Sequence, residues 1–534
     1  MNNSPEQIYN EYLQGERYKA AIGSKGLFEQ IRINERFFIG DHWHGAAASN
    51  ERPLVRHNLI KRIGDYKMSV LTAMPVNVAY SAEGVPNTAA IKSTVRESRK
   101  KLSQGISAGL TGPAEKAMAL SALNDYFGVT SARLKLNSVL EKALRNAYIS
   151  GTGIVYTYWD ASLKTGLYAD WNNKTPIKGD IKAECIPVEN VIFGDAYLTD
   201  IEEQPYILLK YLMRPELAAR EAEEFSGPKA AQDILNEKTD ANGKIIVITK
   251  LFKVYENGEY KVMAIKSTEK AIIRPAYFTG LRKYPIAAIS WERVNNSAYG
   301  ESEITNLIPN QIAINRMITA GVWSAMAMGM PTMIVNGDVV GGEITNDPGQ
   351  IIKVYGSADD IENAVHFVSP PDYSGNYKGL IEPLIENTLA QSGANPAALG
   401  DVAPNNTSAI LALRNAAQLP LQQLQNRYYD FVADIAKIWA EFWITMYGNR
   451  KIRIDDENGS WYYDFDAEKY KDLLISAKVL VQAGNVNTAE KCIETLDKLL
   501  EKGVITAKEY LERLPENTVP NLSELLIKNE EVQL

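Results

Sequence analysis

Cysteine is nearly absent from this chain. Only Cys185 and Cys492 occur among 534 residues, and more than half of the chain separates them. Two cysteines so far apart exclude the dense disulfide framework of small secreted domains. The first residues, MNNSPEQIYNEYL, contain neither a basic stretch nor an apolar run, so we expect no secretory signal. Both observations favour a reducing cytoplasm as the place of synthesis.

Histidine is also scarce, and recognisable catalytic motifs are missing. The four histidines are at positions 42, 44, 57 and 366. We find no phosphate-binding loop, nucleophile elbow, dinucleotide fingerprint or HExxH pair. Asp41, His42 and His44 are close in sequence, but no cysteine or second carboxylate completes a metal-ligand set. We therefore expect a protein that is not an enzyme and that has no metal site and no cofactor.

In the second half of the chain, acidic residues outnumber lysine and arginine. The net charge is -8 overall, and it divides into +6 for residues 1–300, -8 for residues 301–450 and -6 for residues 451–534. A protein that grips nucleic acid tightly would show the opposite sign over its binding surface. Residues 301–450 are therefore not expected to hold nucleic acid firmly.

Helical and strand-like segments follow one another along the whole chain, whose length predicts two to four domains. Residues 151–294 contain alternating and β-branched runs, which predict an antiparallel β domain with one inserted helix, Pro215 to Asn236. Inside it, the pair Asn257-Gly258 predicts a type I′ hairpin turn. The expected fold class is α+β.

The second half is organised around helices. Its expected order is a helix over 302–329, a small strand-like lobe over 332–369, a helix over 379–392, a polar loop over 395–407 and a long amphipathic helix over 408–447. Pro420 predicts a kink near Ala416–Pro420. Residues 449–466 then predict a hairpin, to which Ala477–Val481 would add a third strand.

One uncharged segment leaves two interpretations open. Met317 to Gly337 spans 21 residues without a charge, which is close to the length that crosses a bilayer. The segment is rich in Ala, Gly and Met, poor in Leu, Ile and Phe, and interrupted by Pro331. We therefore favour a helix buried between protein neighbours over a membrane span.

Four segments, in this order, resemble the portal proteins of tailed bacteriophages. FFIGDHW followed by RPLVRHNLIKRIGDYKMSVLTAMPVNV is similar to the N-terminal pattern of that family, with His42 where glutamine is usual. ALRNAYISGTGIVYTYWD resembles its G-x-G segment, and SAYGESEITNLIPNQIAINRM resembles the approach to its first stem helix. SAKVLVQAGNVNTAEKCIETLDKLLEKGVITAKEYLERLP resembles its C-terminal region. Chance matches would not keep this order.

The resemblance implies a portal fold with a helical and β wing, a two-helix stem, a small clip lobe and a crown. On this sequence it implies an N-terminal arm at 1–26, the wing at 27–300, stem helices at 301–330 and 373–394, the clip at 331–372, a tunnel loop at 395–407, the long kinked helix at 408–448 and the crown with a C-terminal tail at 449–534.

The resemblance also implies a function. Members form a ring of commonly twelve identical subunits at one capsid vertex, through which double-stranded DNA is packaged and ejected. The implied partners are the large terminase subunit, the major capsid and scaffolding proteins, and the neck or adaptor proteins, with no membrane. The expected location is the virion, after assembly in the cytoplasm of a bacterial host. The residues expected to meet DNA in the channel are Asn405, Asn406 and Thr407 of the tunnel loop and the sparse cations Lys353, Lys378 and Arg414.

Two alternatives stay open at this point. The chain could be another structural protein of a virion, such as a neck adaptor, although a long kinked helix after a polar loop argues against that. It could also be an enzyme whose active site lacks a recognisable motif. The mass of the assembly distinguishes an enzyme from a portal protein, since an ordinary enzyme would be a monomer or a small oligomer and a portal protein would form a large ring.

Overall fold

The computed structural model describes residues 3–45, 54–73, 76–83, 89–103, 112–168, 176–328, 332–341, 353–357, 359, 365–368, 374–394, 419–456, 459–470, 475–480 and 486–514. The chain divides into two compact units. The first comprises Met1–Ile31, Lys67–Ser302 and Ala403–Leu534, and the second comprises Arg32–Tyr66 and Glu303–Val402. Helices and sheets are both abundant, which confirms the α+β class.

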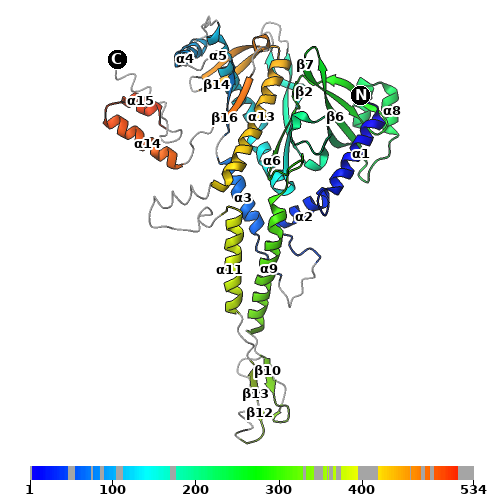
Figure 1. Ribbon diagram of the computed structural model, residues 1–534, viewed down its shortest axis with the longest axis vertical. Helices are drawn as coiled ribbons and strands as arrows, with labels where there is room; N and C mark the ends of the chain where they lie inside the picture. Colours follow the sequence, from blue (N-terminus) through cyan, green and yellow to red (C-terminus); the bar gives the residue numbers. More distant parts are fainter. Residues whose placement is uncertain are drawn as a thin grey trace. The chain divides into compact units, whose positions relative to one another are not determined.

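A five-stranded antiparallel sheet is the largest sheet of the first unit (Figure 1). In spatial order its strands are β4 (Val191–Phe193), β5 (Tyr206–Met213), β6 (Ile245–Glu256), β7 (Glu259–Ser267) and β8 (Ile272–Phe278). Asn257 and Gly258 connect β6 to β7 with φ angles of 53° and 86°. Two positive φ angles are those of a type I′ turn, so this prediction is confirmed.

Helix α1 (Pro5–Ala21) packs on this sheet. Ile8 and Tyr12, one helical turn apart, are buried against β4, β5, β6 and β7. The buried Nζ of Lys250 on β6 lies 2.7 Å from the carboxylate of Glu11. The sequence predicted a polar helical arm over residues 1–26. The helix is confirmed, but one of its faces is apolar and packs on the sheet, because Tyr9 and Leu13 lie partly buried beside Ile8 and Tyr12.

The helix expected over Pro215 to Asn236 is divided in two. The structure has α7 (Pro215–Phe225) and α8 (Pro228–Leu235). Gly227, with a φ of 94°, lies between them, and Pro228 begins the second helix. A left-handed glycine ends one helix and a proline at the first position starts the next.

A three-stranded antiparallel sheet has the order β3-β2-β9. Its strands are β2 (Thr152–Tyr168), β3 (Pro176–Ile186) and β9 (Ile286–Ser290). The predicted helical hairpin precedes it as α5 (Pro113–Leu134) and α6 (Leu136–Ser150), joined at Lys135. Helix α6 packs against β2, and α13 (Gln422–Met446) packs against β9 and β2. Strand β9 is thus at the edge of its sheet.

Of the residues predicted as one long helix, the structure describes those from Leu419 onward. A 3₁₀ turn, Leu419–Leu421, contains Pro420 and leads into α13. The kink predicted near Ala416–Pro420 falls mostly outside the described residues. Large aromatic side chains of α13, Trp439 and Trp443 among them, are fully buried. Helix α13 is therefore a core element of the first unit.

One of the strands after α13 pairs with a strand near the beginning of the chain. Strands β14 (Asn449–Asp456) and β15 (Gly459–Asp466) form the predicted hairpin. The predicted third strand, now β16 (Ile475–Leu480), instead pairs with β1 (Asn77–Ala82). That part of the prediction is wrong, and the expected crown boundary at residue 449 separates segments that share one compact unit. The remaining helices of this unit are α4 (Ala89–Ser103), α14 (Val486–Glu501) and α15 (Ala507–Glu512).

The second unit is built on two helices, α9 (Glu303–Met328) and α11 (Ser374–Gln391), which lie side by side (Figure 1). Between them in sequence are two small antiparallel pairs: β10 (Thr332–Val335) with β13 (Val365–Val368), and β11 (Val340–Gly341) with β12 (Lys353–Val354). The end of α2 (Leu27–Ile39) and the start of α3 (Leu59–Thr72) join this unit, whereas the sequence placed them in the wing. None of the helices in the described part of the chain has the length and apolar character needed to cross a membrane.

Candidate functional site

Helix α9 changes character halfway along its length. Its N-terminal half contributes buried side chains, including Ile304, Gln311 and Ile314. From Met317 to Met326 it carries no charge and no residue is buried. In this half Val322, Trp323 and Met326 are 37%, 38% and 48% exposed. A contiguous apolar surface of this kind marks a contact site for another molecule.

A ladder of polar side chains fixes the position of α9. Gln311, Asn315 and Thr319 are spaced by four residues and therefore share one face of the helix. Thr319 Oγ1 accepts a hydrogen bond from Val55 N (3.1 Å), Asn315 Oδ1 from His57 N (3.0 Å) and Gln311 Oε1 from Leu59 N (2.9 Å). The last of these satisfies one of the backbone donors at the start of α3. The ladder thus attaches the segment before α3 to α9.

His42 continues this network. Its Nε2 lies 3.0 Å from the carbonyl oxygen of Phe37, and its Nδ1 lies 2.8 Å from Nδ2 of Asn315. Nε2 therefore carries the hydrogen and Nδ1 accepts, which is the neutral form of the ring. Burial lowers the pKa of His42, against an opposing contribution from the bond to Phe37. Among the residues that the structure describes, no group of His, Cys, Asp and Glu is arranged to hold a metal ion.

Helix α11 packs against α9 near its C-terminal end, and its described side chains before Thr388 are exposed or half-buried. Asn310 Nδ2 of α9 donates to Thr388 Oγ1 at 3.2 Å, and Thr388 and Leu389 are buried. By contrast, Leu380 is 62% exposed. The α9–α11 pair therefore presents apolar side chains from both helices.

Two of the six residues predicted to meet DNA lie within the described chain. Lys353 is exposed on β12. Lys378 is exposed on α11, where its Nζ lies 3.7 Å from a carboxylate oxygen of Glu382. Asn405, Asn406, Thr407 and Arg414 fall outside the described residues. The structure therefore shows two exposed cations on separate elements, and the grouping of the six residues stays a prediction.

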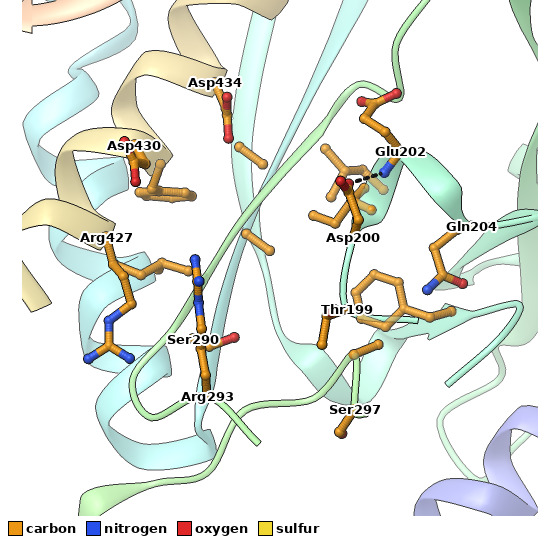
Figure 2. Close-up of a pocket in the computed structure, with 18 of the residues that line it drawn as sticks. Thr199, Asp200, Glu202, Gln204, Ser290, Arg293, Ser297, Arg427, Asp430 and Asp434 are labelled. Atoms are coloured by element: carbon orange, nitrogen blue, oxygen red, sulfur yellow. Dashed lines mark hydrogen bonds between the residues drawn. The ribbon is translucent and has the colours of Figure 1, made fainter. Parts of the chain in front are cut away.

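A cavity of about 710 Å³ lies in the first unit and was not predicted from the sequence. Three segments line it: the loop around Thr199–Gln204, strand β9 with the loop that follows it, and one face of α13 (Figure 2). The α13 residues are spaced by three or four positions from Arg427 to Ile438. The sequence shows the strand and the helix but not their juxtaposition.

The cavity is lined by equal numbers of acidic and basic side chains. These are four carboxylates and four cations: Asp200, Glu202, Asp430, Asp434, Lys283, Arg293, Arg427 and Lys437. Lys437 Nζ lies 3.0 Å from Asp434 Oδ1, and Glu202 is paired with Lys253 at 2.6 Å. Arg293 and Arg427 lie beside each other at one side (Figure 2). Burial lowers the pKa of Arg427, and the nearby charge of Arg293 lowers it further, whereas Glu292 opposes both effects. The lining as a whole is therefore balanced in charge.

Comparison with known proteins gives one family. The profile described as Phage P22-like portal protein matches residues 141–470. The matched region begins within α6 and ends at Tyr470, so it includes the three-stranded sheet, the α9–α11 pair and α13. No curated protein matches the chain.

Proposed function

Because the chain belongs to the P22-like family of phage portal proteins, we propose that its copies form a closed ring at one vertex of the capsid. The ring would have about twelve subunits and would conduct double-stranded DNA during packaging and ejection. It would work in the virion after assembly in the bacterial cytoplasm. The matched region covers most of the chain, so the family assignment extends over both compact units.

The exposed C-terminal half of α9 is the observation that best supports a ring. Its side chains are uncharged from Met317 to Met326 and none is buried within one subunit. Neighbouring copies would remove this apolar surface from water, which is favourable by about 25 cal/mol for each Å² buried. Ala320, Gly321 and Ala325 are small and allow close approach of a neighbouring helix. In a cyclic assembly every copy is covered by the next one.

The charge distribution supports a channel through which DNA slides. Residues 301–450 have a net charge of -8, and an acidic lining repels phosphates and prevents tight binding. We assign weak guiding contacts to the exposed cations Lys353 and Lys378, to Arg414, and to the polar loop residues Asn405, Asn406 and Thr407. The residues facing DNA would thus position it without holding it.

The remaining surfaces would serve as docking sites. We assign the small strand lobe between α9 and α11 to the large terminase subunit and, after packaging, to neck or adaptor proteins. We assign the first unit to the major capsid and scaffolding proteins. The energy for DNA movement would come from the terminase, so the portal itself would act as a structural protein.

The first experiment measures the mass of the assembly. Twelve copies of the 59.3 kDa chain would give about 712 kDa by light scattering, and negative-stain images should show rings with a central hole. The double variant Val322→Glu, Met326→Glu places two charges one turn apart on the exposed face of α9 and should shift the population to smaller species. Leu235→Glu on α8, where the leucine is 47% exposed, is the matched control and should form the ring.

A compact dimer or tetramer without a central hole would contradict the proposal. An unchanged ring in the Val322→Glu, Met326→Glu variant would contradict only the role of α9, because it would show that α9 does not contribute to contacts between copies.

A further inference from the structure

One face of the β2–β3 ladder becomes polar toward one end. Tyr156 pairs with Glu184, and two residues further along β2, Tyr158 pairs with Lys182. These four side chains lie on the same side, because alternate residues of a strand point to the same face of a sheet. Tyr156, Tyr158 and Glu184 are half-buried, whereas the side chain of Lys182 is 44% exposed. Water therefore reaches this face from the end at Lys182.

Three tyrosine side chains lie around the carboxylate of Glu184. Tyr156 is its cross-strand partner, and the rings of Tyr156 and Tyr158 are stacked, with centroids 5.3 Å apart and planes inclined by 25°. From β5, the hydroxyl of Tyr211 donates a hydrogen bond to Glu184 Oε1 at 3.2 Å. Burial raises the pKa of Tyr211, and the nearby Tyr156 and Glu184 raise it further. The Tyr211 phenol therefore stays neutral and can donate to the carboxylate.

Acidic groups are in excess on this face. It carries two carboxylates, Asp160 and Glu184, and one cation, Lys182. The ammonium group of Lys182 is paired with Asp160, with an Nζ–Oδ2 distance of 2.5 Å. Within the described residues Glu184 has the hydrogen bond from Tyr211 and no ion pair. A carboxylate that is partly removed from water gains from a cationic partner.

The chain already contains a contact between a cation and a tyrosine ring in this region. The guanidinium carbon of Arg274 lies 3.6 Å from the ring centroid of Tyr277 and 4.6 Å from that of Phe225. Tyr277 packs against the same hydrophobic core as Tyr156 and Tyr211. The face of an aromatic ring attracts a cation electrostatically. Tyrosine rings in this region therefore accept a guanidinium group.

We propose that Glu184 and the rings of Tyr156 and Tyr158 bind an arginine or lysine side chain that belongs to another polypeptide. The carboxylate would accept charge-assisted hydrogen bonds from the cation, and the ring faces would attract it. Arginine fits better, because its planar guanidinium stacks on aromatic rings and binds a carboxylate through two parallel hydrogen bonds. The cation can come from a neighbouring copy in the ring or from another protein of the virion, and the site itself does not depend on the ring.

Amidation of Glu184 measures whether a cation occupies this site. A water-soluble carbodiimide activates the carboxyl group, glycinamide attacks it to form an amide, and the carbodiimide leaves as a urea. Mass spectrometry of the peptide that contains Glu184 gives the rate. N-acetyl-arginine amide should slow this reaction severalfold, whereas the uncharged N-acetyl-citrulline amide should not. Glu216, which is exposed on α7, should react equally fast with either compound present.

Substitutions of Tyr158 test the contribution of the aromatic ring. Tyr158→Leu removes the ring face and keeps an apolar side chain, so most of the protection by N-acetyl-arginine amide should be lost. Tyr158→Phe keeps the ring and should retain the protection. Tyr260→Leu is the matched control, because Tyr260 is 57% exposed on β7, and it should retain the protection as well. An unchanged midpoint of thermal unfolding shows that each variant is folded.

Comparison of the ring with smaller species identifies the source of the cation. If a neighbouring copy supplies it, Glu184 should react more slowly in the ring than in the Val322→Glu, Met326→Glu variant, and N-acetyl-arginine amide should protect only the variant. If another protein supplies it, Glu184 should react equally fast in both, and the compound should protect both. The proposal is overturned if the arginine and citrulline compounds give the same rate in every species. That result would leave the proposed ring standing, since light scattering measures the ring separately.

Discussion

Gly151 and Gly153 stand where the backbone of β2 meets two other segments. A Cβ at Gly153 would lie 2.0 Å from the carbonyl oxygen of Ala143 on α6, and a Cβ at Gly151 would lie 2.2 Å from that of Gly300. Gly151 also has a φ of 88°, which favours glycine. The G-x-G pattern in the family resemblance therefore has a packing reason in this chain.

Gly153→Ala should destabilise the protein by about 2–3 kcal/mol, because the new methyl group meets backbone atoms that cannot move aside cheaply. Urea denaturation measures the free energy of unfolding. Gly128→Ala is the matched control, since Gly128 lies within α5 and a Cβ there meets nothing within 4 Å. Alanine at that position should stabilise the helix by about 0.5–1 kcal/mol. Equal effects of the two substitutions would contradict the close approach of α6 and β2.

At the scale of elements, the second unit depends on the contacts between α9 and the segment that leads into α3. Three side chains of α9 accept hydrogen bonds from backbone N–H groups of Val55, His57 and Leu59. His42 joins the end of α2 to the same helix through Asn315. Two pieces of chain that are more than 250 residues from α9 in sequence are therefore held by polar groups on one helix face.

His42→Ala should cost about 1–3 kcal/mol at pH 7.5, because it leaves Asn315 Nδ2 without its partner and removes one of the two hydrogen bonds to Phe37 O, the other coming from Gly40 N. His42→Gln should cost less, since its amide can donate to Phe37 O and accept from Asn315. The measurement is urea denaturation followed by tryptophan fluorescence. A larger loss in the glutamine variant than in the alanine variant would contradict this network.

His42 should also make the free energy of unfolding depend on pH. Burial lowers the pKa of His42 below its ordinary value of 6.5 in the folded protein, so the unfolded chain takes up the proton first. The contribution of His42 is therefore present above about pH 6.5 and is lost as pH falls through the lower folded pKa. His42→Gln should remove this part of the decrease, while His57, whose pKa is also lowered by burial, retains its own.

At the scale of the whole molecule, charge is divided unevenly along the chain. Residues 1–300 have a net charge of +6, and the remainder of the chain is acidic. A portal needs a body that contacts other proteins and a channel that does not retain DNA. The sparse polar and cationic residues assigned to the channel would then affect DNA movement more than assembly.

Deleting Asn405–Thr407 should leave ring formation intact and impair packaging or retention of DNA, because the proposed tunnel loop would contact DNA and not neighbouring subunits. Light scattering measures the ring, and nuclease-protected DNA in assembled heads measures packaging. A deletion of the same length in an exposed turn, Thr239–Ala241 between α8 and β6, should change neither. Loss of the ring in the first deletion would show that the loop has been placed wrongly.

The sequence by itself determined the features that depend on neighbouring residues. Asn257 and Gly258 determine the turn between β6 and β7, and the helical patterns over 302–329 and 379–392 predicted α9 and α11. The α+β class and the portal resemblance also came from the order of segments. Gly227-Pro228, which divides the inserted helix, is also a local signal, but the single helix predicted over Pro215 to Asn236 did not take it into account.

Tertiary structure alone decided which distant segments meet. Strand β16 pairs with β1 and not with the adjacent hairpin, and α1 is buried against the five-stranded sheet. For the candidate site, the sequence identified the uncharged half of α9 and the cations Lys353 and Lys378, but not the cavity beside β9. The physical reason is that backbone preferences act over a few residues. The place of β9 at the edge of its sheet and the meeting of Arg293 with Arg427 depend instead on how sheets and helices pack after many intervening residues have folded.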